Sequence, residues 1–251
     1  MSVKLTVVGC SPAWPNPGGA QSGYLVENGD RGRLLLDCGP GVLARLRERE
    51  QWPVLDAIAI THFHLDHWGD LVPWVWGAMF GPASKLRPPE LWLPPGGQDT
   101  LRELGRQLGK PEMFDEAFRV REYRDGEAFE TAGFEVTARH VLHYDLLAFG
   151  FRVYATATTL AYSGDSGPSS ELVELARDAD LFLCEATLEE SNPEGGLRGH
   201  LSADEAKEAF DASGAKRLLL THRPTERPLD AAFEQVHDGY ELVLEPIGRR
   251  A

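Results

Sequence analysis

Apolar residues along the chain fall into short runs that are rich in Val, Ile and Leu and are separated by Gly, Pro and polar turns. Runs of this length predict β-strands, whereas apolar residues that recur every three or four positions predict amphipathic helices. In the first two thirds of the chain, helices are predicted at 41–50, 67–80 and 98–109. Strands are predicted at 3–9, 23–28, 33–39, 54–62, the start of 89–97, 118–123, 133–140, 148–154 and 157–163.

From residue 168 onward, helical and strand-like segments alternate. Helices are predicted at 168–177, 202–213 and 228–237, and strands at 180–185, 216–221 and 240–244. Two strand-rich halves that each end in helix–strand alternation predict two packed sheets with helices outside, a four-layer αββα sandwich of the α/β class. No linker-like segment or repeat interrupts the chain, so we expect one domain over residues 1–251.

Composition and charge narrow the class of partner. The chain has 251 residues, a formal net charge of −14 and a pI near 5.0. An acidic surface repels a polyphosphate backbone, so we expect no long nucleic acid as partner, while a small phosphorylated molecule stays open. No apolar stretch reaches the roughly 18 residues that a membrane span needs, so no membrane association is expected.

The cysteines and the N-terminus bear on the compartment. Cys10, Cys38 and Cys184 lie far apart and are odd in number, which favours a reducing compartment over a disulfide framework. The N-terminal apolar run is short and strand-like, and does not have the form of a signal peptide. We therefore expect a soluble, cytoplasmic protein.

The sequence ITHFHLDHW at 60–68 combines three histidines with an aspartate directly after an apolar run. His62 and His64 project to the same side of an extended strand end, because the side-chain period of a strand is two. Asp66 and His67 follow at the turn into the next predicted helix. Imidazole nitrogens and carboxylate oxygens suit zinc, iron or manganese. Because a buried strand rarely ends in four such groups without a bound ion, the stretch predicts a metal site.

Further candidate ligands stand at the ends of other predicted strands. His222 follows the apolar run LLLT, and Asp165 lies between a predicted strand and a predicted helix. His140 and His143 are three residues apart, so on a strand they point to opposite faces, and we expect only one of them to be a ligand. His237 lies in a stretch predicted as an amphipathic helix, where a surface position is expected.

Six segments occur in a fixed order and spacing: THFHLDH, HYDLLAFGFRV, YSGDSGPSSELVELA, CEATL, GHLSADEAKEAF and LLLTHRP. Together they resemble the metallo-β-lactamase superfamily, and most closely its ribonuclease Z-like branch of small metal-dependent phosphodiesterases. The similarity runs from about residue 3 to 225. It implies two divalent metal ions, with zinc expected before manganese or iron, and a homodimer, the common state in this branch.

The resemblance also implies roles for individual residues. An ion-bridging hydroxide would attack the scissile centre, since a metal lowers the pKa of its water toward ~7. Asp66 would orient that nucleophile or accept its proton. In this pattern His143, rather than His140, is the ligand. The implied ligands are His62, His64 and His143 for one ion, Asp66, His67 and His222 for the other, and Asp165 as the bridge between them.

Glu185 and His200 match a pair that acts as general acid in the ribonuclease Z pattern, where the Glu orients the His that protonates the leaving alkoxide. General acid catalysis of this kind contributes about 10²–10⁴-fold. Ser202 and Glu205 predict a capping box that would fix the loop carrying His200. The His-Glu-Ala-Thr motif of the family reads CEAT here, and Cys184 is expected to be a small buried residue.

The interval between His143 and Asp165 spans 22 residues, which leaves no room for the tRNA-binding arm that ribonuclease Z carries there. The resemblance therefore favours a phosphodiesterase for a small-molecule substrate, cyclic and nucleotide diesters included. An ester, lactone or thioester hydrolase of the same fold is the alternative. Trp68, beside His67, is the expected substrate contact. The other aromatic residues of 68–80 are expected in the core or at an interface.

Overall fold

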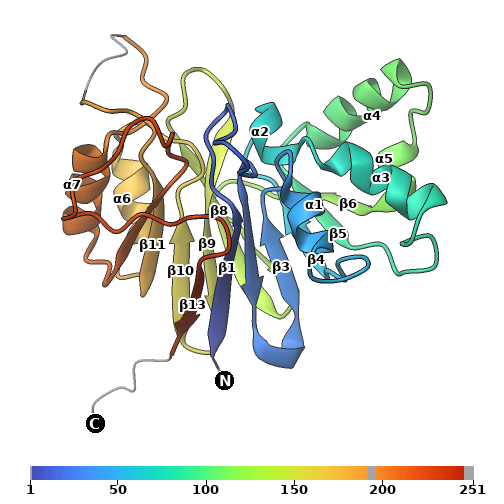
Figure 1. Cartoon of the computed structure of the whole chain (residues 1–251), viewed down its shortest axis with the longest axis horizontal. Coiled ribbons are helices and arrows are strands. Elements are labelled where there is room, and N and C mark those ends of the chain that lie inside the picture. Colours follow the sequence, from blue (N-terminus) through green and yellow to red (C-terminus); the bar gives the residue numbers. More distant parts are fainter. Residues whose placement is uncertain (1, 192–195, 246–251) are drawn as a thin grey trace.

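The structure, a computed structural model, describes residues 2–191 and 196–245. Over these residues two mixed β-sheets pack face to face, with helices on both outer faces (Figure 1). This arrangement confirms the predicted αββα sandwich. The helices are α1 (Val42–Arg47), α2 (Leu65–Trp68), α3 (Leu71–Phe80), α4 (Gly97–Gln107), α5 (Met113–Ala117), α6 (Ser170–Ala176) and α7 (Ala203–Ser213), with a 3-10 turn at Gly29–Arg31. The strands are β1 (Val3–Gly9), β2 (Gly23–Glu27), β3 (Arg33–Leu36), β4 (Ala57–Ala59), β5 (Glu90–Leu93), β6 (Arg119–Glu122), β7 (Ala128–Thr131), β8 (Phe134–Val141), β9 (Ala148–Ala155), β10 (Thr158–Tyr162), β11 (Leu181–Glu185), β12 (Leu218–Thr221) and β13 (Glu241–Leu244).

Strand direction decides where side chains at strand ends gather. In the described chain, one sheet has the order β13-β1-β2-β3-β4-β5-β6 and the other has β12-β11-β10-β9-β8-β7. β3 and β4 are parallel, as are β10, β11 and β12. β8 runs in the same direction as β10, because both are antiparallel to β9. The carboxyl ends of these strands therefore lie at one edge of each sheet, and each candidate ligand follows one of these ends.

Alternation along the strands divides the apolar side chains among three layers of core. Leu36 and Leu183 face the space between the sheets, where both are fully buried. Their neighbours point the other way: Leu35 packs under α1 and α3, and Phe182 packs under α6 and α7. Burial of such side chains contributes about 1.5–3 kcal/mol each, so both faces of each sheet hold the strand ends in place.

Two segments differ from their predicted structure. Residues 228–237 form no helix, and that prediction is wrong. Glu234 accepts a backbone hydrogen bond from Leu220 at 2.8 Å, and Val236 donates one to Leu220 at 2.9 Å. The segment thus extends along the open edge of β12, where pairing with the sheet replaces the helical hydrogen bonds that its amphipathic pattern predicted.

The helix predicted at 67–80 is divided into α2 and α3. Gly69 separates them, and a Cβ added there would lie 2.9 Å from the ring of Pro40. The amide of Asp70 leaves the helical pattern to donate to the carbonyl of Cys38 at 3.0 Å.

In addition, β7 and α5 are elements that the sequence pattern missed. No helix in the described ranges is long and apolar enough to cross a membrane.

Candidate metal centre

The motif at 60–68 spans the end of β4 and the first turn of α2. The chain leaves β4 through Thr61 and His62, His64 precedes the helix with extended backbone angles, and Asp66 and His67 lie within α2. This change from strand to helix turns four polar side chains toward one space. It is the arrangement that the spacing of the motif predicts.

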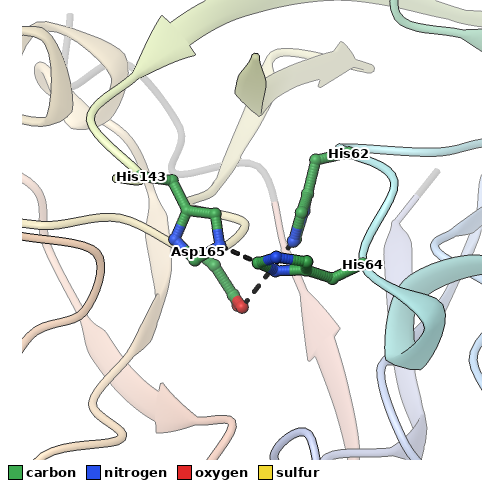
Figure 2. A group of neighbouring side chains, drawn as sticks. All are labelled: His62, His64, His143 and Asp165. Carbon is green, nitrogen blue, oxygen red and sulfur yellow. Dashed lines mark hydrogen bonds and ion pairs between the residues drawn. The ribbon is translucent and has the colours of Figure 1, made fainter. Parts of the chain in front are cut away.

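One group of candidate ligands combines three histidines with an aspartate. The ligand atoms of His62, His64, His143 and Asp165 all lie within 4.8 Å of one another (Figure 2). His143 Nε2 is 2.9 Å from His64 Nδ1, and His62 Nε2 is 3.8 Å from Asp165 Oδ2. The side chains come from the segment after β4, from the loop after β8 and from the loop after β10, so the centre joins the two sheets.

A second group shares Asp165 with the first. It consists of Asp66, His67, Asp165 and His222, which are all buried. His222 Nε2 lies 3.1 Å from Asp66 Oδ2, and His67 Nε2 lies 3.3 Å from Asp165 Oδ2. The Asp165 carboxylate belongs to both groups. It would therefore be a shared ligand if each group held one ion.

Three atoms of the centre fit bound cations because they are buried without a hydrogen-bond partner. They are His62 Nε2, His67 Nε2 and Asp165 Oδ1. A buried polar atom without a partner costs about 1–3 kcal/mol, and a metal ion would satisfy all three. The donor set of imidazole nitrogen and carboxylate oxygen suits a divalent transition metal.

The protonation of the histidines also suits cation binding. Burial lowers the pKa of His62, His64 and His143, which favours the neutral imidazole that ligates metals. His67 behaves differently: burial opposes its charge, but Asp165 and two further carboxylates raise its pKa well above the usual value. The three carboxylates that raise the pKa of His67 make this part of the centre negatively charged, which suits a divalent cation.

The Nδ1 atom of each buried histidine is held by a fixed partner. Thr61 Oγ1 lies 3.0 Å from Nδ1 of His62, and the carbonyl of Gly199 accepts from His143 at 2.7 Å. The other two pairs are His67 with the Asp37 carboxylate at 2.7 Å and His222 with Thr187 Oγ1 at 2.8 Å. Partners of this kind fix the ring orientation and the tautomer, so that each Nε2 points into the centre.

These supporting residues were not predicted from the sequence. Asp37 is fully buried and ends the apolar run RLLLD, which is a signal in itself, since a buried aspartate needs partners. Thr187 follows Glu185 in the segment CEATL and gave no such signal. Both residues reach the histidines through the pairing of neighbouring strands, and the sequence does not specify which strands pair.

Glu185 and His200 form a pair at the edge of the centre. The Glu185 carboxylate is fully buried and lies 2.8 Å from His200 Nδ1. It also accepts from the amide of Ser166 at 3.0 Å and from the amide and hydroxyl of Thr187 at 3.0 and 2.9 Å. The ring of His200 lies parallel to that of His222, 5.9 Å between centroids. These contacts place a partly exposed imidazole beside the metal-binding groups.

The loop before α7 carries His200 and has the predicted capping box. Ser202 accepts from the amide of Glu205, and the Glu205 side chain accepts from the amide of Ser202. Arg198 in turn donates to the His200 carbonyl and pairs with Glu205. Cys184 is buried within β11, as expected for the position.

Other candidates lie outside the centre. His140 is exposed on β8 and His237 is exposed near Gly239. Trp68 packs against Phe63, 5.9 Å between ring centroids, beside the core under α3. A cavity of about 470 Å³ opens beside the centre, and Trp68 is not among the residues that line it. His64, Asp66, Asp165 and His200 line this cavity together with Ala13 and Pro15.

An αββα sandwich with histidine and aspartate groups at the shared ends of its strands defines a metal-dependent hydrolase. Residues 32–223 match the family model described as the beta-lactamase superfamily domain. The chain belongs to this superfamily, in its metallo-hydrolase class, and the predicted resemblance is confirmed.

Individual relatives agree with this assignment. "Probable metallo-hydrolase YhfI" from Bacillus subtilis is 30% identical over 222 residues, which cover 88% of this chain and 87% of YhfI. The crystal structure of YhfI superposes with a TM-score of 0.82 at 21% identity and covers 97% of this chain and 100% of that chain. The ribonuclease Z of Archaeoglobus fulgidus is 27% identical over 92% of this chain and 90% of its own. A crystal structure described as a new diphosphatase from the PhnP family has a TM-score of 0.75 at 22% identity, with 97% and 98% of the two chains covered.

Proposed function

We propose that the protein is a two-metal phosphodiesterase that hydrolyses a small phosphodiester. The observation that carries the proposal is the Glu185–His200 pair, which places an imidazole on the cavity beside Asp165. His200 Nδ1 lies 4.0 Å from Asp165 Oδ2. In this proposal one ion is held by His62, His64 and His143, the other by Asp66, His67 and His222, and Asp165 contacts both.

The metal ions, when bound, supply Lewis acidity that activates water and stabilises charge on phosphoryl oxygens. The protein's own residues supply the proton transfers. Asp66 lines the cavity with one carboxylate oxygen 3.1 Å from His222, so it can orient an attacking water or accept its proton. His200 donates a proton to the departing alkoxide, and Glu185 holds its imidazole in one orientation.

The position of an acid favours a phosphodiester over a carbonyl ester. An alkoxide that leaves phosphorus needs a proton in the transition state, and a positioned imidazole is the usual donor. A small substrate is supported by the segment between His143 and Asp165, which consists of β9, β10 and their short turns and carries no arm. The cavity of about 470 Å³ is of the size that takes a mononucleotide or a smaller diester. Cyclic diesters belong to the same class.

Substrate choice can be tested with a panel. The purified protein, with its metals counted, is assayed on bis(p-nitrophenyl) phosphate, p-nitrophenyl acetate and a lactone, each with added zinc or manganese. Metal-dependent turnover of the diester alone is expected. Turnover of the acetate or lactone alone would contradict the proposal and favour an ester, lactone or thioester hydrolase.

The acid can be tested with His200→Ala. We expect a loss of about 10²–10⁴-fold on a diester with a poor alkoxide leaving group, and a much smaller loss on one that releases p-nitrophenolate, which needs no proton. Metal content should be unchanged. His140→Ala, an exposed histidine on β8, is the control and should match the native protein. Equal losses on both substrates would argue against an acid role.

The remaining expectations belong to the same proposal. We infer zinc as the native metal because the donor set is nitrogen and oxygen, with manganese or iron as alternatives. Elemental analysis of protein purified without added metal distinguishes them. A homodimer, one domain over the whole chain and a cytoplasmic location stay predictions. Light scattering, limited proteolysis and fractionation of the source cells test them in turn.

A further inference from the structure

The cavity beside the metal centre has one amide side chain in its wall. Gln21 lines this cavity together with His64, Asp66, Asp165 and His200, and it is only 6% exposed. Gln21 precedes β2 of one sheet, whereas His200 lies between β11 and β12 of the other sheet. The amide and the proposed acid therefore reach the cavity from different sheets.

Backbone contacts hold Gln21 beside Asp66. The amide of Gln21 donates to the carbonyl of Pro40 at 3.0 Å, and the amide of Ser22 donates to the carbonyl of Asp66 at 3.2 Å. Gly39 permits this approach, because a Cβ on Gly39 would clash with the Asp66 carbonyl and lie 3.0 Å from Gln21 Cβ. Gln21 is thus fixed next to the residue that orients the attacking water in the proposed reaction.

The side-chain amide of Gln21 has one orientation. Its Nε2 donates to the carbonyl of Pro12 at 3.2 Å and to the carbonyl of Ala13 at 2.6 Å. These two acceptors establish which end of the amide is nitrogen, because an oxygen in that place would face two further oxygens. Since both N–H groups bind the loop after β1, the Oε1 atom faces away from these carbonyls.

The Oε1 atom of Gln21 is an unused acceptor. Among the residues that the structure describes, none donates a hydrogen bond to it, and it is not one of their buried atoms that lack a partner. The backbone of Gln21 is covered by Pro40 on its amide side and by Gly9 on its carbonyl side. The side chain therefore makes the contact with the cavity. An acceptor that is already held in place loses little conformational entropy when a ligand group binds to it.

We propose that Gln21 determines substrate specificity, with its Oε1 accepting a hydrogen bond from a hydroxyl group of the substrate. This inference rests on the phosphodiesterase function proposed above. It narrows the substrate class to phosphodiesters whose retained alcohol carries a further hydroxyl group, as sugars and polyols do. The departing alkoxide lies toward His200, so the retained alcohol lies on the side of Gln21. An alkyl diester reaches the same centre but leaves Oε1 without this donor, which disfavours it.

The test compares diesters that share a leaving group and differ in one hydroxyl group. The 3-hydroxypropyl ester of p-nitrophenyl phosphate is paired with the butyl ester, and the 4-hydroxybutyl ester with the pentyl ester, so the members of a pair match in size. All four release p-nitrophenolate. In at least one pair, kcat/KM should be about three- to tenfold higher for the hydroxyl ester, the effect of one neutral hydrogen bond. Equal values within both pairs would overturn the inference.

Two variants separate recognition from support of the loop. Gln21→Met removes the acceptor at similar side-chain length and should abolish the preference for the hydroxyl ester, whereas loss of its bonds to the loop would slow both esters equally. Asn16→Ala is the matched control, because Asn16 binds the carbonyl of Arg223 and the amide of Thr225 from the same loop and does not line the cavity. This control should keep the preference. A preference that persists in Gln21→Met, or that Asn16→Ala abolishes as well, would refute the recognition role.

A binding measurement separates this inference from the proposed reaction. The hydroxyalkyl and alkyl monophosphates of both chain lengths are titrated into the metal-loaded protein in a calorimeter. At one length or both, native protein should bind the hydroxyalkyl phosphate about three- to tenfold more tightly, and Gln21→Met should bind the two alike. If native protein cleaves no diester but shows this Gln21-dependent preference, the phosphodiesterase proposal fails and the recognition role stands. If it cleaves all four diesters and shows no preference in either measurement, the recognition role fails alone.

Discussion

Asp37 is the carboxylate that holds the metal-binding strand end in position. It is fully buried and accepts hydrogen bonds from the amide of Thr61 at 2.8 Å, from His67 Nδ1 at 2.7 Å and from the hydroxyl of Tyr162 at 2.8 Å. Replacement by asparagine keeps the volume and removes the charge. Asp37→Asn therefore tests whether the support of His67 matters for metal binding.

The contacts of Asp37 set the expected magnitude. An amide has one acceptor oxygen in place of two, so the amide NH₂ must face at least one of the donors now bound to Asp37, which include the Thr61 hydroxyl. An unsatisfied buried donor costs about 1–3 kcal/mol, and the free energy of unfolding should fall by that amount. Loss of a carboxylate that orients a ligating histidine typically weakens metal binding by about 10–100-fold. The ion held by His67 should show this loss, and the other ion should change little.

The assay combines metal competition against a chromophoric chelator with urea unfolding of the metal-free protein. Asp180→Asn is the control: this carboxylate accepts from the amide of Thr159 at 2.8 Å, before β11 and at the opposite end of that strand from Glu185. The control should lose stability and keep metal affinity. Unchanged metal affinity in Asp37→Asn, or an equal loss in the control, would refute the reasoning.

Three further outcomes are expected. Asp165→Ala should release both ions and abolish activity, as measured by metal analysis, and two ions retained would rule out a shared ligand. Removal of both ions with a chelator should lower Tm by about 16–32 °C. Each ion at a thousandfold excess over its Kd adds about 4 kcal/mol, and 1 kcal/mol shifts Tm by about 2–4 °C in a chain of this size. A Tm unchanged in differential scanning calorimetry would contradict this. Burial raises the pKa of the thiols of Cys10, Cys38 and Cys184, so a chromogenic disulfide at pH 8 should label no thiol in the native protein and three after denaturation.

The candidate ligands could be located from the sequence because each is marked by the residues directly before it in the chain. His62, His143, Asp165 and His222 each follow an apolar strand, and such strand ends meet at one edge when the strands run the same way. Alternation along a single strand predicted that only one of His140 and His143 is a ligand, and the family resemblance selected His143. All seven candidate ligands, together with Glu185 and His200, gather at one centre in the structure.

What the sequence could not provide depends on contacts between distant segments. Asp37 and Thr61 are joined by the parallel pairing of β3 with β4, and Thr187 reaches His222 through the pairing of β11 with β12. The wrong helix at 228–237 has the same origin, since the edge of β12 offers hydrogen bonds that no local pattern reveals. Trp68, the expected substrate contact, packs beside the core under α3 and is not among the residues that line the cavity.

Backbone conformation gives an argument that the centre is preorganised. Asp37, Tyr144 and His222 have φ values of 59°, 51° and 55°, in the left-handed region that non-glycine residues seldom adopt. Each such residue costs about 1–3 kcal/mol and persists only where its surroundings fix it. Thr187 helps to fix the conformation of His222, because its hydroxyl lies within hydrogen-bond distance of both Nδ1 and the carbonyl of that residue. Since this strain is maintained by the protein's own contacts, we expect metal affinity to depend strongly on the supporting residues.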